Sequence, residues 1–377
     1  MNPIAQLFFL FLRLGAVSFG GPVAHIAIFE REIVRKRGWM TPERFLELVG
    51  ATNLIPGPNS TEMAMHCGYI RRGIPGLIAA GLGFILPSVL ITGALAWAYR
   101  QYGTLPEIAP FLYGVRPAVM GIMAPALLAM SRKAIKSARL AILGILVMGA
   151  SFLGLGEVEA ILGAGAIGLF LFHLDNRGKT GPSEGFSLLL WKGATLGTSL
   201  SAMSLFGVFF KIGAVLFGSG LVLMAYLEDE LVSKRGWLTM ETLVEAVAIG
   251  QFTPGPVLST ATFIGFHLLG WKGALAATVG VFLPSFVYAG LMHPLLNAMV
   301  GSARWKAFLD AVSIGALAIM AAVVVRMGIY FLEDPGYVLI AILAVLAGIF
   351  RPNWGPLLLV AGGAALGRIW LLLSGAY

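Results

Sequence analysis

Cysteine and charge are both scarce in this sequence. Cys67 is the single cysteine among 377 residues, so no disulfide can form within the chain. The five histidines lack the spacing of metal ligands, and the sequence contains no Walker loop, nucleophile elbow or HExxH motif. No soluble basic domain accompanies the net charge of +8. We therefore expect no metal, no cofactor and no nucleic-acid partner, and an intramembrane enzyme is disfavoured.

Apolar residues are correspondingly abundant. They make up 58% of the chain, charged residues make up 12%, and the mean hydropathy is +0.88. Average soluble domains carry roughly 25% charged residues, so this chain belongs in a bilayer. Long apolar runs without two-residue alternation predict an all-α polytopic membrane protein rather than a barrel. The candidate spans are 74–99, 107–130, 140–155, 158–173, 272–299, 306–332, 336–350 and 355–373, besides two openings at 4–35 and 203–233.

The chain contains an internal repeat. Residues 13–58 align without a gap on residues 211–256, so that Lys36-Arg37-Gly38-Trp39 returns as Lys234-Arg235-Gly236-Trp237. After a one-residue slip the match resumes, and Leu86-Pro87-Ser88 returns as Leu283-Pro284-Ser285. Paired repeats in a hydrophobic chain commonly build one central transport site between them.

The repeat sets the expected domain organisation. We expect an N-terminal membrane repeat at 1–173, a polar linker at 174–200 and a C-terminal membrane repeat at 201–377. No basic region precedes Arg13, and the opening recurs in the second half, where it could not be cleaved. The opening is therefore expected to be a working segment rather than a signal peptide.

Each half begins with irregular elements. In the first half, Gly20-Gly21-Pro22 interrupts the apolar opening, which predicts a broken helix. A short helix over 41–55, capped by Thr41, stops at Pro56-Gly57-Pro58, and a second short helix follows at 59–72. Neither helix spans comfortably, so the pair predicts a re-entrant hairpin.

The topology follows from how often the opening crosses. If it crosses once, each half has five crossings, giving about ten spanning helices besides a broken helix and a re-entrant hairpin in each half. An odd number inverts the second half relative to the first, and the N-terminus is then periplasmic. If the opening turns back at Gly20-Gly21-Pro22, the N-terminus is cytoplasmic. If Leu188–Met203 also crosses, the repeats are parallel.

Basic residues indicate the cytoplasmic side of the first half, because positive charge concentrates there in short loops. Arg100 alone lies on the other side. In the second half the count is nearly even and does not decide between inverted and parallel repeats. The residues on the basic side are Arg35, Lys36, Arg37, Arg44, Arg71, Arg72, Arg132, Lys133, Lys136, Arg139, Arg177 and Lys179.

Two cations occupy equivalent positions inside the apolar openings: Arg13 and Lys211. A cation at the centre of a spanning helix costs about 2.5–3.5 kcal/mol on the insertion scale unless it finds a partner or water. One interpretation is that the two side chains snorkel to the interface. The other, favoured by their matched positions, is that both serve a ligand or counter-ion.

A Pro-Gly-Pro turn begins the second hairpin helix in both halves. Helix N-termini carry roughly +0.5 charge and bind anions, and the amides of 59–61 and 257–259 are expected to be free and to face one small region. The motif could instead merely kink two helices. The expected anion-binding residues are Asn53, Pro56, Gly57, Pro58, Asn59, Ser60 and Thr61 in the first half, with Gln251, Pro254, Gly255, Pro256, Ser259 and Thr260 in the second.

Other charged residues allow two interpretations each. Arg116 has Ser313 as its repeat counterpart, so it either joins the site or pairs with an acid. Glu62 follows the first Pro-Gly-Pro, where a carboxylate either complements the helix dipole or couples proton movement to anion movement. Glutamates that precede basic residues at helical spacing are expected to form ion pairs with them. These are Glu30, Glu32, Glu228 and Glu230.

The sequence resembles the chromate ion transporters of the long-chain, two-domain type. The resemblance rests on Phe19-Gly20-Gly21-Pro22, Lys36-Arg37-Gly38-Trp39 and Pro56-Gly57-Pro58-Asn59, and on their second-half counterparts. The second half departs at Ser219-Gly220 and at Val257. The resemblance implies chromate export across the bacterial cytoplasmic membrane, with chromate or a sulfate-like oxyanion as the ligand.

The sequence thus predicts a secondary oxyanion transporter embedded in the lipid bilayer. Two repeat-matched cations and two helix N-termini suit a dianion. The alternatives are a transporter of sulfate or another tetrahedral oxyanion, a passive anion channel and, least favoured, an intramembrane enzyme. The sequence also allows a homodimer.

Overall fold

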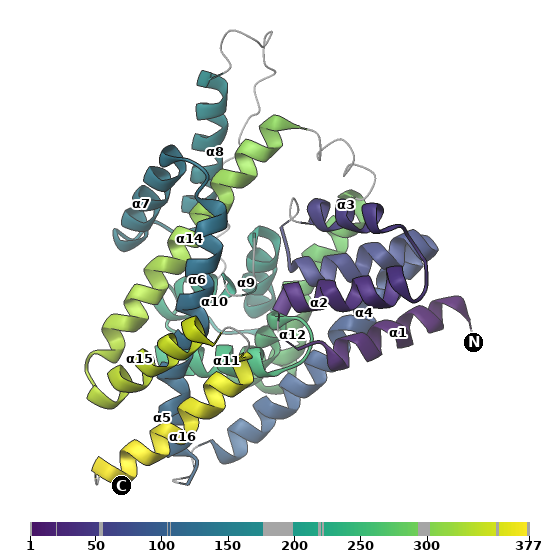
Figure 1. Cartoon of the computed structure of the whole chain (residues 1–377). Coiled ribbons are helices and arrows are strands. Elements are labelled where there is room, and N and C mark those ends of the chain that lie inside the picture. Colours follow the sequence, from purple (N-terminus) through teal and green to yellow (C-terminus); the bar gives the residue numbers. More distant parts are fainter. Residues whose placement is uncertain are drawn as a thin grey trace.

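The computed structural model describes residues 2–19, 21–52, 56–103, 105, 107–175, 199–217, 220, 222–292, 302–351 and 354–374. Within these ranges every regular element is a helix, as Figure 1 shows. The polar linker lies almost entirely outside the described residues, since α8 ends at Asp175 and the chain resumes at 199.

Six helical stretches are long and apolar enough to cross a membrane. They are α4 (Asn59–Tyr102), α5 and α6 together (Ala109–Ala118 and Met120–Ala134), α8 (Glu157–Asp175), η3 with α12 (Val257–Ser259 and Thr260–Met292), α14 (Ala303–Phe331) and α16 (Pro356–Ser374). Shorter apolar helices are α1 (Pro3–Val17), α7 (Ala138–Phe152), α9 (Ala202–Val215) and α15 (Pro335–Phe350). The chain is a multi-pass membrane protein, and most of its expected spans coincide with these helices.

The opening of each half is a broken helix that folds back on itself. α1 ends at Val17, and α2 (Gly21–Phe29) with η1 (Glu30–Arg35) follows after the break. The rings of Phe11 and Phe29 lie 5.8 Å apart, whereas 18 residues of continuous helix would separate them by about 27 Å. Figure 1 shows α2 running back beside α1. The two arms of the opening therefore fold back on each other rather than forming one continuous helix.

The second half repeats this fold-back. α10 (Leu223–Leu227) and η2 (Glu228–Ser233) follow α9, and Lys211 of α9 reaches Glu230 of η2 at 2.8 Å. Tyr226 also donates a hydrogen bond to the Val215 carbonyl oxygen at 2.8 Å, which ties α10 to the end of α9.

The hairpins match the prediction more closely. α3 (Pro42–Thr52) begins after Thr41, whose hydroxyl accepts from the Arg44 amide at 3.3 Å. α4 then starts at Asn59 and bends sharply at Arg72 and Gly73, so its first segment forms the returning arm of the hairpin. In the second half, α11 (Met240–Phe252) and α12 repeat the arrangement, with the bend at Leu269 and Gly270.

Close helix crossings hold the broken helices against the long ones. A Cβ at Gly15 of α1 would lie 2.4 Å from the Phe84 carbonyl oxygen of α4, and a Cβ at Gly213 of α9 would lie 2.2 Å from that of Val281 in α12. Gly15 and Gly213 are repeat equivalents, so the same backbone approach occurs twice. It fixes the ends of α1 and α9 near the middle of the molecule.

Candidate functional site

The two Pro-Gly-Pro turns meet the breaks of the opposite half. The Gly57 amide donates to the Leu216 carbonyl oxygen at 2.6 Å, and the Gly255 amide donates to the Ser18 carbonyl oxygen at 2.8 Å. Gly57 is the repeat equivalent of Gly255, and Ser18 is the equivalent of Leu216. Each half therefore completes the other by the same bond. We call the two turns together with the two breaks that they contact the junction.

Glycine is required at the centre of both turns. Gly57 has φ 143° and Gly255 has φ 91°, a region that side chains with a Cβ rarely adopt. A Cβ at Gly57 would lie 2.2 Å from Glu62 Oε1 and 2.9 Å from Ser285 Oγ. A Cβ at Gly255 would lie 3.0 Å from the Ser88 Cβ. The serines of the repeated Leu-Pro-Ser triplets thus flank the turn of the opposite half.

Hydroxyl groups form hydrogen bonds with one another around the second-half turn. Ser88 Oγ lies 2.7 Å from Ser259 Oγ and 3.3 Å from the Pro256 carbonyl oxygen. Thr92 donates to Ser259 Oγ at 3.1 Å, and Thr253 donates to the Gly250 carbonyl oxygen at 3.0 Å. All four side chains are buried. This cluster joins α4 of the first half to the start of α12.

The first-half turn is different, because its polar atoms are buried and unsatisfied. Thr61 Oγ1, both carboxyl oxygens of Glu62 and Ser285 Oγ have no hydrogen-bond partner within the described part of the chain. The Ser18 hydroxyl, beside the second-half turn, also lacks one there. Glu62 is 0% exposed. Buried groups of this kind are rare, since each unsatisfied group costs about 1–3 kcal/mol, and a proton, a ligand or water can satisfy them.

The two turns do not start their helices in the same way. α4 begins directly at Asn59, but Val257–Ser259 forms a 3-10 turn before α12 begins. The Thr61 and Ser259 amides donate to the Pro58 and Pro256 carbonyl oxygens at 2.8 Å and 3.0 Å. The expectation that the amides of 59–61 and 257–259 are all free is therefore wrong at the third position of each turn.

The remaining expected residues vary in burial. Pro58, Ser60, Pro254 and Thr260 are buried, and Pro56 and Asn59 are half-buried. Gln251 is half-buried, and its Nε2 has no partner among the described residues. Asn53 lies outside the described residues.

The repeat-matched cations are paired with repeat-matched carboxylates. Arg13 lies 3.7 Å from Glu32, and Lys211 lies 2.8 Å from Glu230. The Arg13 side chain is 66% exposed and that of Lys211 is 26% exposed, whereas both glutamates are buried. The described contacts include no hydrogen bond from either cation to a Pro-Gly-Pro turn. The fold-back of each opening supplies these partners, which sequence spacing does not reveal.

Additional cations surround the same glutamates. Lys36 lies 2.6 Å from Glu32, and this hydrogen bond is the largest cause lowering the pKa of Glu32. Burial alone would raise the pKa of Glu230, but Lys211, Lys234 and Arg235 together lower it. Both glutamates lie outside the six candidate spans. Each is therefore ionised near neutral pH and shared by more than one cation.

Two expected pairings are resolved by the structure. Arg116 takes the second of its two interpretations and pairs with an acid, since its Nε lies 2.8 Å from Glu245 Oε1. Glu30 and Glu32 pair with Arg35 and Lys36 as expected. Glu228 also forms an ion pair as expected, but its partner is Arg326 of α14 at 2.5 Å rather than a following basic residue.

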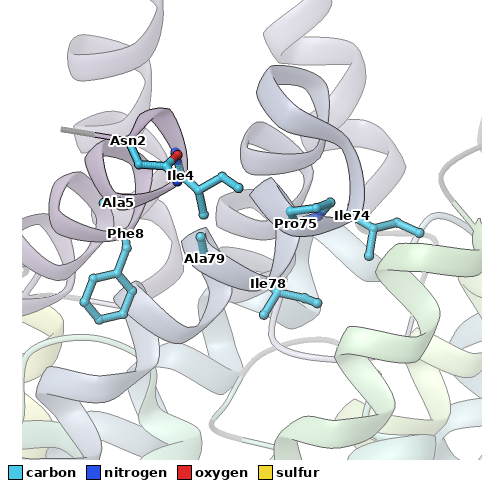
Figure 2. Close-up of a pocket in the computed structure, with 8 residues that line it drawn as sticks. All are labelled: Asn2, Ile4, Ala5, Phe8, Ile74, Pro75, Ile78 and Ala79. Carbon is cyan, nitrogen blue, oxygen red and sulfur yellow. The ribbon is translucent and has the colours of Figure 1, made fainter.

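A cavity beside α1 has the wrong chemistry for an anion. It has a volume of about 610 Å³ and lies between α1 and the bend of α4, where Figure 2 shows its lining. Phe8, Ile74 and Ile78 dominate that lining, and no charged residue contributes to it. Ile74 and Ile78 are also exposed on the apolar outer surface. The cavity therefore fits lipid contact, and the junction remains the candidate site.

Comparison with known families identifies the chain. The sequence model described as chromate transporter matches twice, at residues 5–169 and at residues 203–368. The chain belongs to the chromate transporter family. Each match includes one broken helix, one hairpin and the long helices that follow, so the family unit is the repeat itself.

Similar proteins cover nearly the whole chain. A probable chromate transport protein of Synechococcus elongatus is 32% identical over 91% of this chain and 89% of its own length. A chromate transport protein of Cupriavidus metallidurans is 31% identical over 97% of this chain and 93% of its own. A further one from Pseudomonas aeruginosa is 31% identical over 84% and 79%. No solved structure matches the chain.

Sequence reasoning missed Ser88, Thr92, Thr253 and Ser285 as site residues. A signal was present for the serines, because Leu86-Pro87-Ser88 and Leu283-Pro284-Ser285 recur at equivalent positions. The triplets mark the repeat, but only the crossing of α4 with α12 shows that each serine faces the turn of the other half.

Proposed function

We propose that this protein is a secondary transporter that moves chromate across the bacterial cytoplasmic membrane, in the direction of efflux. The anion binds at the junction of the two Pro-Gly-Pro turns. The observation that carries this proposal is the reciprocal pair of hydrogen bonds from Gly57 to Leu216 and from Gly255 to Ser18. It links the start of each second hairpin helix to the opposite half, which supports the proposal that both helix N-termini serve one transport site between the repeats.

Donors at the junction suit a tetrahedral oxyanion. The hydroxyls of Thr61 and Ser285 have no partner among the described residues and can donate, and the first amides of α4 add the positive end of its dipole. Sulfate shares the size and charge of chromate, so sulfate-like oxyanions are included as substrates. Asn53, Asn59, Ser60, Gln251 and Thr260 are proposed to complete the set.

Positive charge around Glu32 and Glu230 is in excess. Arg13, Lys36 and Arg37 all act on Glu32, while Lys211, Lys234 and Arg235 all act on Glu230. Asp229 also pairs with Lys234, so three cations face one carboxylate in the first half and two in the second. We propose that Arg13 and Lys211, which lie on the helices ending at the junction, use this surplus to attract the dianion.

Glu62 is proposed to couple the anion to a proton. An ionised carboxylate beside Gly57 would repel a dianion at the first-half turn, whereas a protonated one can donate a hydrogen bond to it. Thr260 replaces Glu62 in the second repeat, so one proton accompanies each anion. The absence of a partner for either Glu62 oxygen in the described structure supports this role.

We infer that the two repeats are inverted. Arg100 Nη1 lies 3.7 Å from the position of a Cβ on Gly270, the repeat equivalent of Gly73. Gly73 and Arg100 lie at opposite ends of the straight part of α4, about 40 Å apart. In parallel repeats Gly270 would lie at the level of Gly73. Lys136 also reaches Asp310 at 2.6 Å, which supports the same arrangement.

The number of membrane crossings in each half is then even rather than odd. With the opening turned back and the hairpin returning, α4, α5–α6, α7 and α8 give four crossings. Inversion of the second half then requires an odd number of crossings before α9, and residues 176–198 lie outside the described chain. The basic side of the first half is proposed to be cytoplasmic, and the N-terminus with it.

Two other functions are open to test. A passive anion channel would conduct without a coupled proton and would depend steeply on voltage. An enzyme would need an activated nucleophile, and the relatives are named transport proteins instead.

Uptake into inside-out vesicles tests the proposal. Labelled chromate should accumulate, sulfate should compete, and collapsing the proton gradient should change the rate. Vesicles without the protein provide the background. Chromate uptake at background level would refute the transport proposal, and uptake insensitive to the proton gradient would refute the role of Glu62.

A further inference from the structure

The same helical face is buried in one hairpin and exposed in the other. In α11, Val244 is 0% exposed and the Glu245 side chain is 2% exposed. Their repeat equivalents in α3 are Leu46, 68% exposed, and Glu47, whose side chain is 59% exposed. The sequences of the two helices are related, so the difference reflects where each helix lies rather than what it contains.

Residues of the first half bury the α11 face. Arg116 Nε lies 2.8 Å from Glu245 Oε1, and Tyr99 donates to the other Glu245 oxygen. Arg116 also reaches the Tyr337 hydroxyl at 3.2 Å. α11 packs against α5 and α16 at this point. The second-half hairpin is therefore docked.

A second arginine secures the broken helix beside that hairpin. Arg326 of α14 lies 2.5 Å from Glu228 of η2 and also donates to Ser151 Oγ of α7 at 2.9 Å. The first-half equivalent of Glu228 is Glu30, which pairs with Arg35 of its own segment on the exposed surface. Ala129 stands where Arg326 would be when Arg116 is aligned with Ser313.

The α3 face has no such cover. Glu47 pairs with Arg44 of the same helix at 2.8 Å, and their side chains are 59% and 43% exposed, respectively. Two carboxylates, Glu43 and Glu47, share this face with Leu46. Charged side chains in hydrocarbon are costly, so this face lies against water rather than lipid tails.

We propose that transport exchanges the two hairpins: α3 docks on α14 and α8 while α11 leaves α5 and α16. The repeat supplies the geometry of the second state. Because Arg116 corresponds to Ser313 and Glu245 to Glu47, the contact that replaces Arg116–Glu245 is Glu47 against Ser313. The described state has the second-half side closed and the first-half side open. This inference rests on the proposed transport function and names the moving parts of the same site.

The arginines explain why the described state is favoured. Ser313 cannot form the ion pair that Arg116 forms, so the exchanged state lacks this salt bridge. Removing both charges of the Arg116–Glu245 ion pair shifts the equilibrium toward the exchanged state. Substituting Arg116 alone would leave the buried Glu245 carboxylate unpaired. The variant of choice is therefore Arg116→Gln/Glu245→Gln.

Thiol labelling of the repeat-equivalent reporters Leu46→Cys and Val244→Cys measures the exchange directly. Native Cys67 is fully buried, so it does not compete. In the otherwise unchanged protein Leu46→Cys should react quickly and Val244→Cys slowly. Adding Arg116→Gln/Glu245→Gln should speed Val244→Cys labelling roughly tenfold, which corresponds to about 1.4 kcal/mol. The control is Arg139→Gln/Asp175→Gln, which removes an exposed ion pair between α7 and α8, outside both hairpins, and should leave Val244→Cys labelling unchanged.

Cross-linking identifies the docked partner. A short bifunctional thiol reagent is used, because a disulfide cannot bridge Cα atoms more than about 7 Å apart. Glu47→Cys/Ser313→Cys should cross-link within one chain, faster in the presence of Arg116→Gln/Glu245→Gln. Neither assay requires chromate, so the exchange is tested even if transport of chromate fails. Unchanged Val244→Cys labelling, absence of the 47–313 cross-link, or cross-linking of Leu46→Cys between two copies would overturn the proposal.

Discussion

At the scale of single residues, the site depends on polar groups that differ between the two repeats. Ser88 is bonded to Ser259 and to the second-half turn, whereas its equivalent Ser285 is buried without a partner in the described structure. An unsatisfied hydroxyl contributes nothing to stability. Substituting Ser88 and Ser285 in turn can therefore distinguish an effect on folding from an effect on ligand binding.

We expect Ser285→Ala to lower chromate transport while leaving thermal stability unchanged or raised. Ser88→Ala should instead lower stability, by about 1 kcal/mol, because it removes a satisfied hydrogen bond. Melting temperature and vesicle uptake, measured on both variants, check the difference. A stability loss of equal size in both would return Ser285 to a structural role.

Arg13 and Lys211 should contribute to transport rather than to folding. Arg13→Gln and Lys211→Gln should each lower anion affinity by roughly ten- to a hundredfold, the range of about 1.5–3 kcal/mol for a charge-assisted hydrogen bond. Both variants should stay inserted, because Lys36 still pairs with Glu32, and Lys234 and Arg235 with Glu230. Concentration-dependent uptake gives the affinity.

Two further variants sharpen this prediction. The double glutamine variant should lose less than the two single losses combined if both cations serve one anion. Arg13→Lys should also be impaired, because an ammonium cannot reproduce the two-pronged grip of a guanidinium. Wild-type uptake in both single variants would leave the cations as partners of Glu32 and Glu230 only.

Glu62 should determine the pH dependence. If the anion binds only when Glu62 is protonated, uptake falls as pH rises. Glu62→Gln mimics the protonated carboxyl, so its uptake should lose that dependence while remaining measurable. Uptake across a pH series, with the gradient collapsed, compares the two proteins. An identical pH profile in the variant would contradict proton coupling.

At the scale of elements, sequence reasoning recovered the helices but not how one of them turns. The break at Gly20-Gly21-Pro22 was readable because glycine and proline interrupt an apolar run. Its angle was not, because it depends on Phe11 packing against Phe29 and on Arg13 reaching Glu32, contacts between residues far apart in sequence. The hairpin was predictable, since its cap and its Pro-Gly-Pro stop are local signals.

The turned-back opening gives a test of topology. Cysteines at Asn2 and Ile135, both on exposed residues, should react with an impermeant thiol reagent from the same face of the membrane. Labelling of intact cells and of inside-out vesicles identifies that face, which we expect to be cytoplasmic. Reaction from opposite faces would restore a single crossing of the opening.

At the scale of the whole molecule, the repeat predicts a shared site, and the fold supplies its construction. Sequence alone placed Gly57 and Gly255 as equivalents but could not show that each bonds to the other half. These two bonds between the halves depend on the packing of α4 against α12, which no local sequence pattern encodes. The asymmetry between the hairpins was likewise invisible, because α3 and α11 have related sequences and differ in what covers them.

The central claim is that one oxyanion binds between the two turns. The anomalous signal of chromium in crystals grown with chromate locates the anion directly. The account predicts one peak between residues 56–61 and 254–260, within hydrogen-bonding distance of Ser285 or Thr61. A peak confined to the exposed faces of Arg13 and Lys211, or in the apolar cavity beside α1, would contradict it.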